Sequence, residues 1–153
     1  MTSSVDNLFA PIKIGSLVLP NRLCMAPMGR GFCVEGVPAK ELGDYYRRRV
    51  EGGAGLIFTE ATTIDHPVAS MAKACPTIHG EQSLAVWRNI VKEVHAAEGL
   101  MVLQLWHCGT MREGDDVFNP EMLPMGPSGL YAKDKPGAQA MSIADIQDVI
   151  AAF

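Results

Sequence analysis

The residues most capable of chemistry lie at the end of an apolar run over residues 100–106. Within that run Gln104 interrupts a series of Leu, Met and Val residues, and Trp106 and His107 follow it closely. A carboxamide in such a strand costs about 1–3 kcal/mol unless its polar atoms find partners. Next to an indole and an imidazole, Gln104 is typical of a group that orients a bound ligand. His107 taken alone fits a hydrogen-bonded histidine of the core or rim.

Two other apolar runs also end in residues that could contact a ligand. Residues 26–31, Ala-Pro-Met-Gly-Arg-Gly, follow one run, and Glu60 and Ala61 close the other. Small residues would let a flat ligand approach the backbone N–H groups, although a plain turn fits the same composition. Glu60 fits a structural ion-pair partner better than a functional acid. The two glycines do not form a dinucleotide fingerprint, because no G-x-G-x-x-G motif leads into a helix.

These three run ends can meet because the sequence predicts strands that alternate with helices. That order builds right-handed βαβ units and a parallel sheet, whose ligand site lies at the carboxyl ends of the strands. The last run is apolar almost throughout, which predicts a strand buried on both faces. The expected elements are a hairpin over 8–19 turning at Gly15 and Ser16, strands at 23–26, 56–58 and 100–106, a helix opened by Pro38 and ended by Gly52 and Gly53, and a helix capped by Ser83 and stopped by Gly99.

The chain beyond residue 106 departs from this alternation of strands and helices. Residues 107–140 are rich in Gly, Pro and Asp and predict no helix, and a connection of this length is usually a functional lid. Ser142 and Asp145 then predict a capping box at the start of a helix. Such a helix, with no stop signal, predicts a further parallel strand; the alternative is a terminal helix closing a small α/β sheet. Its apolar stripe is Ile146, Val149, Ile150 and Phe153.

Composition sets the outer limits of the prediction. The 153 residues are 48% hydrophobic and carry a net charge of −4. This favours one globular domain with a core, yet the length falls short of the about 250 residues of a complete (β/α)8 barrel. Scattered cations exclude a nucleic-acid surface. We also expect no membrane span, which needs roughly 20 apolar residues, and no signal peptide.

The cysteines indicate the cellular compartment. They are widely separated and form no C-x-x-C motif, which predicts reduced thiols, no metal site and a cytoplasmic location. The four positions are Cys24, Cys33, Cys75 and Cys108.

Four segments, in order along the chain, resemble the old yellow enzyme family of FMN-dependent ene-reductases. The first includes Leu-Phe-Ala-Pro-Ile-Lys-Ile-Gly, and the second reads Gly-Ala-Gly-Leu-Ile-Phe-Thr-Glu-Ala. The third is Gln-Leu-Trp-His-Cys-Gly, and the fourth leads from Gly-Pro-Ser to the predicted capping box. The resemblance runs from about residue 8 to the last residue. The segments lie at 8–28, 53–61, 104–109 and 126–146.

The resemblance implies an α/β fold, the (β/α)8 TIM barrel, of which this chain would supply the N-terminal hairpin and the first three βα units. Residues 1–153 would be the N-terminal portion of a single FMN-binding domain. The hairpin would span 8–19, the βα units 22–153 and a lid-like excursion 107–140. In such enzymes NADH or NADPH reduces FMN, and the flavin passes a hydride to an activated alkene, typically an enone.

The resemblance also implies roles for individual residues. Cofactor binding is expected of Pro27, Met28 and Gly29 through the backbone. Ala61 matches a small residue beside the flavin. Gln104 matches the Gln whose amide can pair with the flavin's pyrimidine edge and tune its electronics.

Trp106 and Arg30 are expected to line the substrate pocket. Two positions depart from the family pattern. Gly29 stands where many members carry a Thr or Cys that contacts a flavin carbonyl, which predicts a shifted flavin potential. Thr110 stands where an Arg often follows the Gly, so a local polar contact would be lost.

The remaining machinery of the family belongs to later strands. This comprises a substrate-anchoring His/Asn or His/His pair, a proton-donating Tyr, a flavin-facing Arg and a phosphate-binding loop. We therefore expect no catalytic residue in this chain, no activity from it alone, and completion by a C-terminal half or another copy. The alternatives are a small α/β ligand-binding domain without activity and a half-barrel subunit that depends on a partner.

Overall fold

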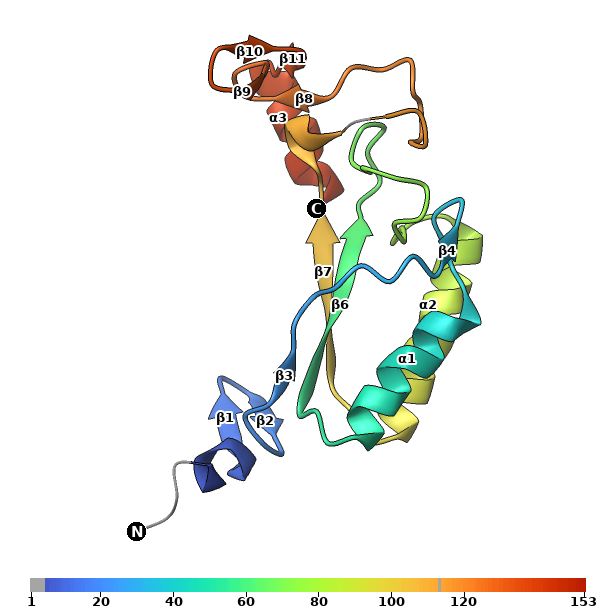
Figure 1. The fold of residues 1–153 in the computed structure, drawn as a ribbon, viewed down its shortest axis with the longest axis vertical. Coiled ribbons are helices and arrows are strands. Elements are labelled where there is room, and N and C mark those ends of the chain that lie inside the picture. The colour runs from blue at the N-terminus through green and yellow to red at the C-terminus, as the bar shows by residue number, and fades with distance from the viewer. Residues whose placement is uncertain (1–4, 113) are drawn as a thin grey trace.

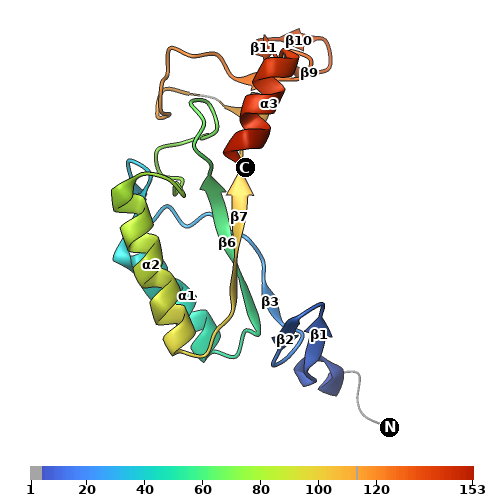
Figure 2. The same ribbon diagram turned by 180° about the vertical axis from the view of Figure 1, so that it is seen from behind.

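The centre of the fold is a three-stranded parallel sheet. A computed structural model describes residues 5–112 and 114–153 (Figure 1). Two helices connect the strands and cover one face of the sheet, as Figures 1 and 2 show. The alternating pattern predicted this βαβαβ order. In chain order the elements are β3 (Cys24–Met25), α1 (Lys40–Glu51), β6 (Leu56–Thr63), α2 (Glu81–Ala96) and β7 (Met101–Trp106).

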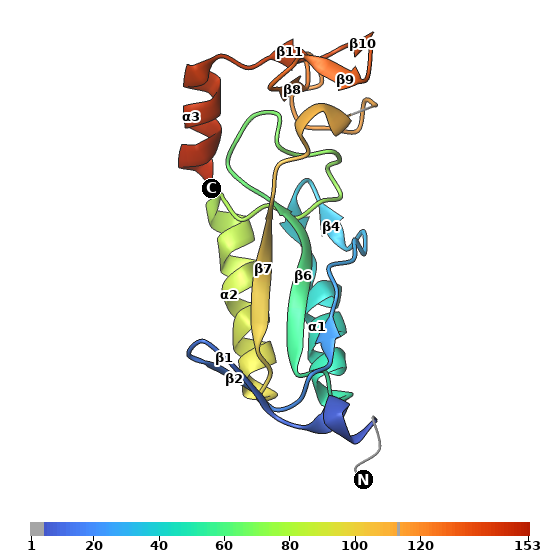
Figure 3. The same ribbon diagram turned by 90° about the vertical axis from the view of Figure 1, so that its left-hand side faces the viewer.

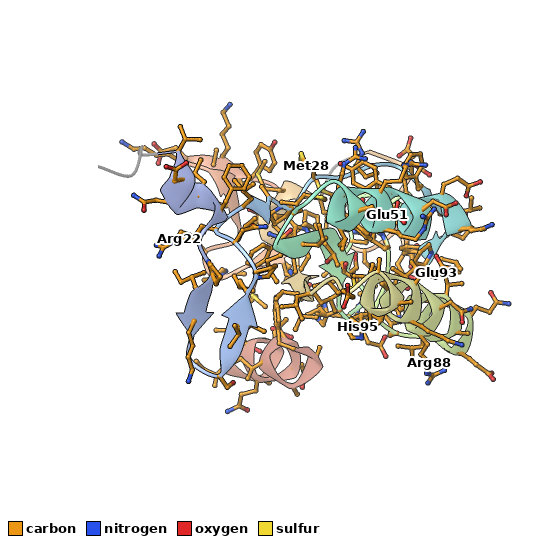
Figure 4. The ribbon with its side chains drawn as sticks, turned by 90° about the horizontal axis from the view of Figure 1, so that it is seen from below. Arg22, Met28, Glu51, Arg88, Glu93 and His95 are labelled. Atoms are coloured by element: carbon orange, nitrogen blue, oxygen red, sulfur yellow. The ribbon has the colours of Figure 1, made fainter. Side chains whose placement is uncertain are left out.

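The core fills the space between that face of the sheet and the two helices. Tyr46 of α1, Ile57 of β6 and Val94 of α2 are all 0% exposed. Gly43 lets the helices approach each other, because a Cβ there would lie 3.2 Å from Ile90 Cγ1. Each such side chain stabilises the fold by roughly 1.5–3 kcal/mol when fully buried. Polar residues such as Arg88 of α2 point away from the sheet (Figure 4).

A short hairpin lies at the amino end of the sheet (Figure 1). A 3-10 turn, η1 (Asp6–Phe9), precedes β1 (Ile12–Ile14) and β2 (Leu17–Leu19), which pair antiparallel. The turn between them falls at Gly15, whose φ of +59° suits a residue without a side chain. Seen from below, the sheet lies between this hairpin and the two covering helices (Figure 4).

Asn21 ties the hairpin to the sheet. Its Nδ2 donates to the carbonyl of Gly53 at 2.9 Å, and its Oδ1 accepts from the Leu23 amide at 2.9 Å. Gly55 passes so close that a Cβ there would lie 2.5 Å from Asn21 Oδ1. The side chain thus fixes the chain just before β3 against the turn that leads into β6.

Residues 107–112 and 114–140 form an excursion above the carboxyl end of the sheet (Figure 1). Contrary to the expectation of no helix, it begins with a single 3-10 turn, η2 (Gly109–Met111). Arg112, 6% exposed, holds the excursion together by donating to the carbonyls of Met122 and Asn119. Its short strands are β8 (Met125–Gly126), β9 (Leu130–Ala132), β10 (Lys135–Pro136) and β11 (Gln139–Ala140).

The predicted starts of the first two helices were wrong in detail. Pro38 lies in β5 (Val37–Pro38), which pairs antiparallel with β4 (Cys33–Val34), and α1 begins two residues later. Ser83 does not cap α2, whose N-cap is Gly80. The Ser83 hydroxyl instead donates to the carbonyl of Thr77 at 2.5 Å, so it anchors the preceding loop.

The prediction that β7 is buried on both faces was also wrong for this chain. Val102 and Leu105 are 39% and 38% exposed. Within the described residues β7 is an edge strand, since β6 is its only partner in the sheet. Its apolar sequence is therefore suited to neighbours that the described residues do not provide.

The last helix, α3 (Ile143–Ala152), begins with the predicted capping box. Ser142 Oγ accepts from the Asp145 amide, and Asp145 Oδ2 accepts from the Ser142 amide at 2.7 Å. The helix stands beyond the carboxyl end of β7, apart from α1 (Figure 3). Ile150 and Phe153 of its predicted apolar stripe are 67% and 56% exposed.

We predict that Tyr46→Phe lowers the free energy of unfolding by about 1–3 kcal/mol, because it leaves the buried amide of Glu60 without an acceptor. That amide donates to Tyr46 Oη at 2.9 Å. Tyr45→Phe is the matched control, since the neighbouring hydroxyl forms no hydrogen bond among the described residues. Urea denaturation measures both. Equal losses in the two variants would contradict the assignment.

Candidate functional site

A β-bulge on β6 arranges the predicted site residues. Phe58 pairs with Val102, but the next pair is Ala61 with Gln104, so β6 advances three residues while β7 advances two. The extra residue changes which side chains share a face, as bulges near binding sites commonly do. Ala61 therefore lies directly opposite Gln104 instead of out of register with it.

Thr59 bridges the two strands at the bulge. Its hydroxyl accepts a hydrogen bond from the Gln104 amide at 3.0 Å and donates one to the carbonyl of Glu60 at 3.0 Å. Thr62 also donates to that carbonyl, at 2.9 Å. Both threonines are 0% exposed. Both hydroxyls therefore bond to backbone groups at the bulge.

Next to the bulge lies a hollow of about 550 Å³. It brings together Pro27, from the end of β3, and Gln104, from β7, which are 77 positions apart in the sequence by subtraction of their numbers. The Gln104 carboxamide forms no hydrogen bond to protein within residues 5–112 and 114–153. An amide without a protein partner at the edge of an apolar hollow is available to a ligand. The lining residues are Cys24, Ala26, Pro27, Phe58, Val102, Leu103 and Gln104.

The loop after β3 continues from the hollow through Met28, Gly29 and Arg30. Met28 is 42% exposed, and the one atom near a Cβ added at Gly29 is Glu60 Oε2, at 3.8 Å. The Arg30 guanidinium lies over the ring of Tyr45, 5.1 Å from its centroid. The structure therefore places the Arg30 side chain against α1 and does not bring it into the hollow.

The Glu60 side chain holds this loop through a hydrogen bond to its backbone. Its carboxylate Oε2 accepts from the Arg30 amide at 3.0 Å, while Oε1 is buried without a hydrogen-bond partner. The side chain is 3% exposed, and burial raises the pKa of the carboxyl, against a smaller opposing effect of the Arg30 amide. Burial, helped by the Glu60 charge, also raises the pKa of the Cys33 thiol to about 12. Cys33 is thus no nucleophile at neutral pH.

Trp106 lies two residues beyond Gln104 on β7 and therefore on the same face of the strand. Its indole Nε1 is buried and has no hydrogen-bond partner among the described residues. The Cα partner of Trp106 is Thr63, whose Oγ1 is also buried and unpartnered. Two buried polar atoms without partners therefore lie at neighbouring strand ends.

His107 is paired with His66, a residue that sequence reasoning missed. Their Nε2 and Nδ1 atoms lie 3.1 Å apart, and the Gly109 amide donates to His107 Nδ1 at 3.0 Å. His107 Nδ1 therefore carries no proton, and the neutral ring donates from Nε2 to His66. Burial, followed by the neighbouring His66, lowers the pKa of His107 to about 4. The pair joins the end of β7 to the loop after β6.

A second cavity, of about 590 Å³, lies outside this site. Residues of the loop after β6, the start of α2 and the excursion line it, among them His66, His79 and Phe118. It contains none of the predicted site residues. The described part of the chain holds no cluster of three or more potential metal ligands, and none of its helices is long and apolar enough to cross a membrane.

Residues 7–153 match the family described as the NADH:flavin oxidoreductase / NADH oxidase family. Among curated relatives, 12-oxophytodienoate reductase 7 of Oryza sativa subsp. japonica is 33% identical over 129 residues, covering 84% of this chain and 31% of the relative. Chanoclavine-I aldehyde reductase fgaOx3 of Penicillium roqueforti is 34% identical over 120 residues, covering 78% and 31%. The probable inactive reductase easA of Epichloe festucae var. lolii is 30% identical over 158 residues, covering 98% and 40%.

Solved structures give the same relationship. Morphinone reductase in complex with tetrahydroNAD superposes with a TM-score of 0.84 at 32% identity, covering 95% of this chain and 43% of that one. The old yellow enzyme homologue from Zymomonas mobilis gives 0.81 at 33% identity, covering 95% and 42%. The chain thus spans about a third to two fifths of the length of these curated relatives.

We predict that the His66–His107 pair loses stability in acid. The pKa of His107 in the folded state, about 4, lies below its ordinary value of 6.5, so the folded state binds fewer protons than the unfolded one. The contribution is complete above pH 6.5 and is lost as the pH falls toward 4. Allowing for solvent screening, the free energy of unfolding falls by about 1–2 kcal/mol over this range.

Urea denaturation of the wild type and His107→Gln at several pH values measures this contribution. The raised pKa of Glu60 acts in the opposite direction and is common to both proteins, so it cancels in the comparison. His95→Gln, at an exposed position on α2, is the control. A pH dependence that is identical in the wild type and His107→Gln would contradict the prediction.

Proposed function

Because the chain belongs to the NADH:flavin oxidoreductase / NADH oxidase family, we propose that it forms one wall of an FMN site in an ene-reductase of the old yellow enzyme type. The observation that carries the proposal is the Gln104 carboxamide, which lacks a protein partner and borders the hollow beside Pro27. The predicted fold class is confirmed: the structural neighbours are old yellow enzyme TIM barrels, and this chain has the fold of part of one. The whole protein's activity is proposed from that membership.

The residues present fit a flat, polar-edged cofactor. The Gln104 amide would pair with the pyrimidine edge of FMN, and the backbone of Pro27, Met28 and Gly29 would contact the ring. Ala61, opposite Gln104, has a small side chain, which would leave room for the flavin ring to approach that face of the sheet. Bound FMN would supply hydride transfer from NADH or NADPH to an activated alkene.

The proposed substrate-pocket residues differ in how well their positions support that role. Trp106 shares the face of Gln104, and its unpartnered indole N–H supports a place in the pocket wall. Arg30 would first have to leave the ring of Tyr45. The four cysteines are all free thiols, which supports a reducing compartment such as the cytoplasm.

A second candidate, a half-barrel subunit that depends on a partner, is favoured by the apolar surface at the edge of the sheet. Val102 and Leu105 of β7 and Ile150 and Phe153 of α3 are all exposed. A complementary C-terminal half or another copy of the chain would cover them. A small ligand-binding domain without activity is the remaining alternative, and it predicts a monomer that does not retain flavin.

Gln104→Ala is expected to weaken FMN binding by about tenfold, equivalent to about 1.4 kcal/mol, through loss of the hydrogen bonds at the pyrimidine edge. Quenching of flavin fluorescence during titration with the intact protein gives the dissociation constant. Gln147→Ala, on the exposed surface of α3, is the control and should bind as the wild type does. Unchanged affinity in Gln104→Ala would mean that Gln104 is only a core amide.

Gly29→Thr is expected to shift the flavin potential, by roughly 30 mV for each tenfold change in the relative affinity for oxidised and reduced FMN. The substitution is sterically feasible, because the one atom within 4 Å of the added Cβ is Glu60 Oε2 at 3.8 Å. Gly29 also lacks the positive φ that would strain a threonine. A spectroscopic redox titration measures the potential. No shift would remove the idea that Gly29 sets it.

A further inference from the structure

A side chain of β6 links the two strands at the bulge. Three residues of β6 are set against two of β7 there, and the partly buried backbone amide of Gln104 donates a hydrogen bond to that side chain. The Thr59 hydroxyl lies 3.0 Å away and accepts that hydrogen bond.

Thr59 is well suited to this position. A hydroxyl has one donor and two acceptor lone pairs, so it can accept from the Gln104 amide while donating to the Glu60 carbonyl 3.0 Å away. The side chain is 0% exposed, and its β-branched shape restricts its rotamers. The hydroxyl thus ties both strands together at the bulge.

The next residue of the bulge holds the other side of the site. Glu60 Oε2 accepts from the Arg30 amide, directly after Gly29. Two consecutive residues of the central strand therefore fix the two segments that line the proposed FMN wall. One segment is β7 at Gln104, and the other is the loop that follows Pro27.

We propose that Thr59 is a positioning residue for the cofactor site, which sets the place of the Gln104 carboxamide by holding its backbone amide. This inference rests on the proposed function. Thr59 acts through Gln104 and does not itself touch the ligand, because its side chain is fully buried. A binding amide must be held within roughly 0.5 Å of its productive place. The loss of the hydrogen bond to Thr59 should therefore displace the carboxamide enough to weaken FMN binding.

The test compares three variants of the intact protein. Thr59→Val keeps the shape but removes the acceptor, whereas Thr59→Ser keeps the hydroxyl. Thr62→Val is the comparison variant, because the Thr62 hydroxyl is equally buried, donates to the same Glu60 carbonyl and lies 3.4 Å from Thr59 Oγ1, but does not bond to the Gln104 amide. Two quantities are measured: the FMN dissociation constant and the hydrogen-exchange rate of the Gln104 backbone amide.

We expect Thr59→Val to weaken FMN binding about tenfold and to speed exchange at the Gln104 amide selectively. Thr59→Ser should restore both to within about threefold of the wild type, and Thr62→Val should leave both near wild-type values. If Thr59→Val does not fold, Thr59→Cys takes its place, since a thiol is a weaker acceptor. Its FMN affinity should then fall below that of Thr59→Ser.

Two results would overturn the inference in distinguishable ways. If the wild type binds FMN and Thr59→Val (or Thr59→Cys in its place) binds it equally well, Thr59 serves the fold alone, and the proposed function stands. If the wild type does not bind FMN, the proposed function fails and the inference fails with it. In that case the exchange rate at Gln104 still reports whether the Thr59 hydroxyl holds that amide.

Discussion

The site depends on one irregularity, the extra residue that β6 carries between Phe58 and Ala61. In a regular ladder, Ala61 and Gln104 would not be partners. At the bulge, the Thr59 hydroxyl accepts from the Gln104 amide and the Thr62 hydroxyl donates to the Glu60 carbonyl, so both side chains bond to the backbone there. Helices α1 and α2 make this possible by burying the opposite face, so that Tyr46 can accept from the Glu60 amide.

Some buried polar groups around the bulge have hydrogen-bond partners and others do not. The hydroxyls of Thr59, Thr62 and Tyr46 each form a hydrogen bond within the protein, which rigidifies the strand. Glu60 Oε1, Trp106 Nε1 and Thr63 Oγ1 are buried without partners. Unsatisfied atoms are rare in folded proteins and require an explanation. Three of them lie along β6 and at the end of β7, near the proposed cofactor wall, and a fourth, Arg112 Nε, lies in the excursion.

Much of this arrangement could be predicted from sequence, because it depends on periodicity and on strand ends. Apolar runs separated by amphipathic segments gave the parallel order, and Ser142 with Asp145 gave the capping box. The bulge could not be predicted, since nothing in the residues 56–63 fixes which backbone groups pair. The roles of Thr59 and His66 were missed for the same reason: each depends on a partner more than 40 positions away. Burial of β7 was overestimated because it depends on partner strands, and among the described residues β7 has one, β6.

The most direct test of the central claim is a nitrogen-15 NMR titration of the intact protein with FMN, following both backbone and side-chain amides. If this wall of the barrel holds the cofactor, the largest shifts fall on the Gln104 carboxamide and on the backbone amides of Met28, Gly29 and Arg30. Shifts confined to the cavity beside α2, or none at saturating FMN, would contradict the account.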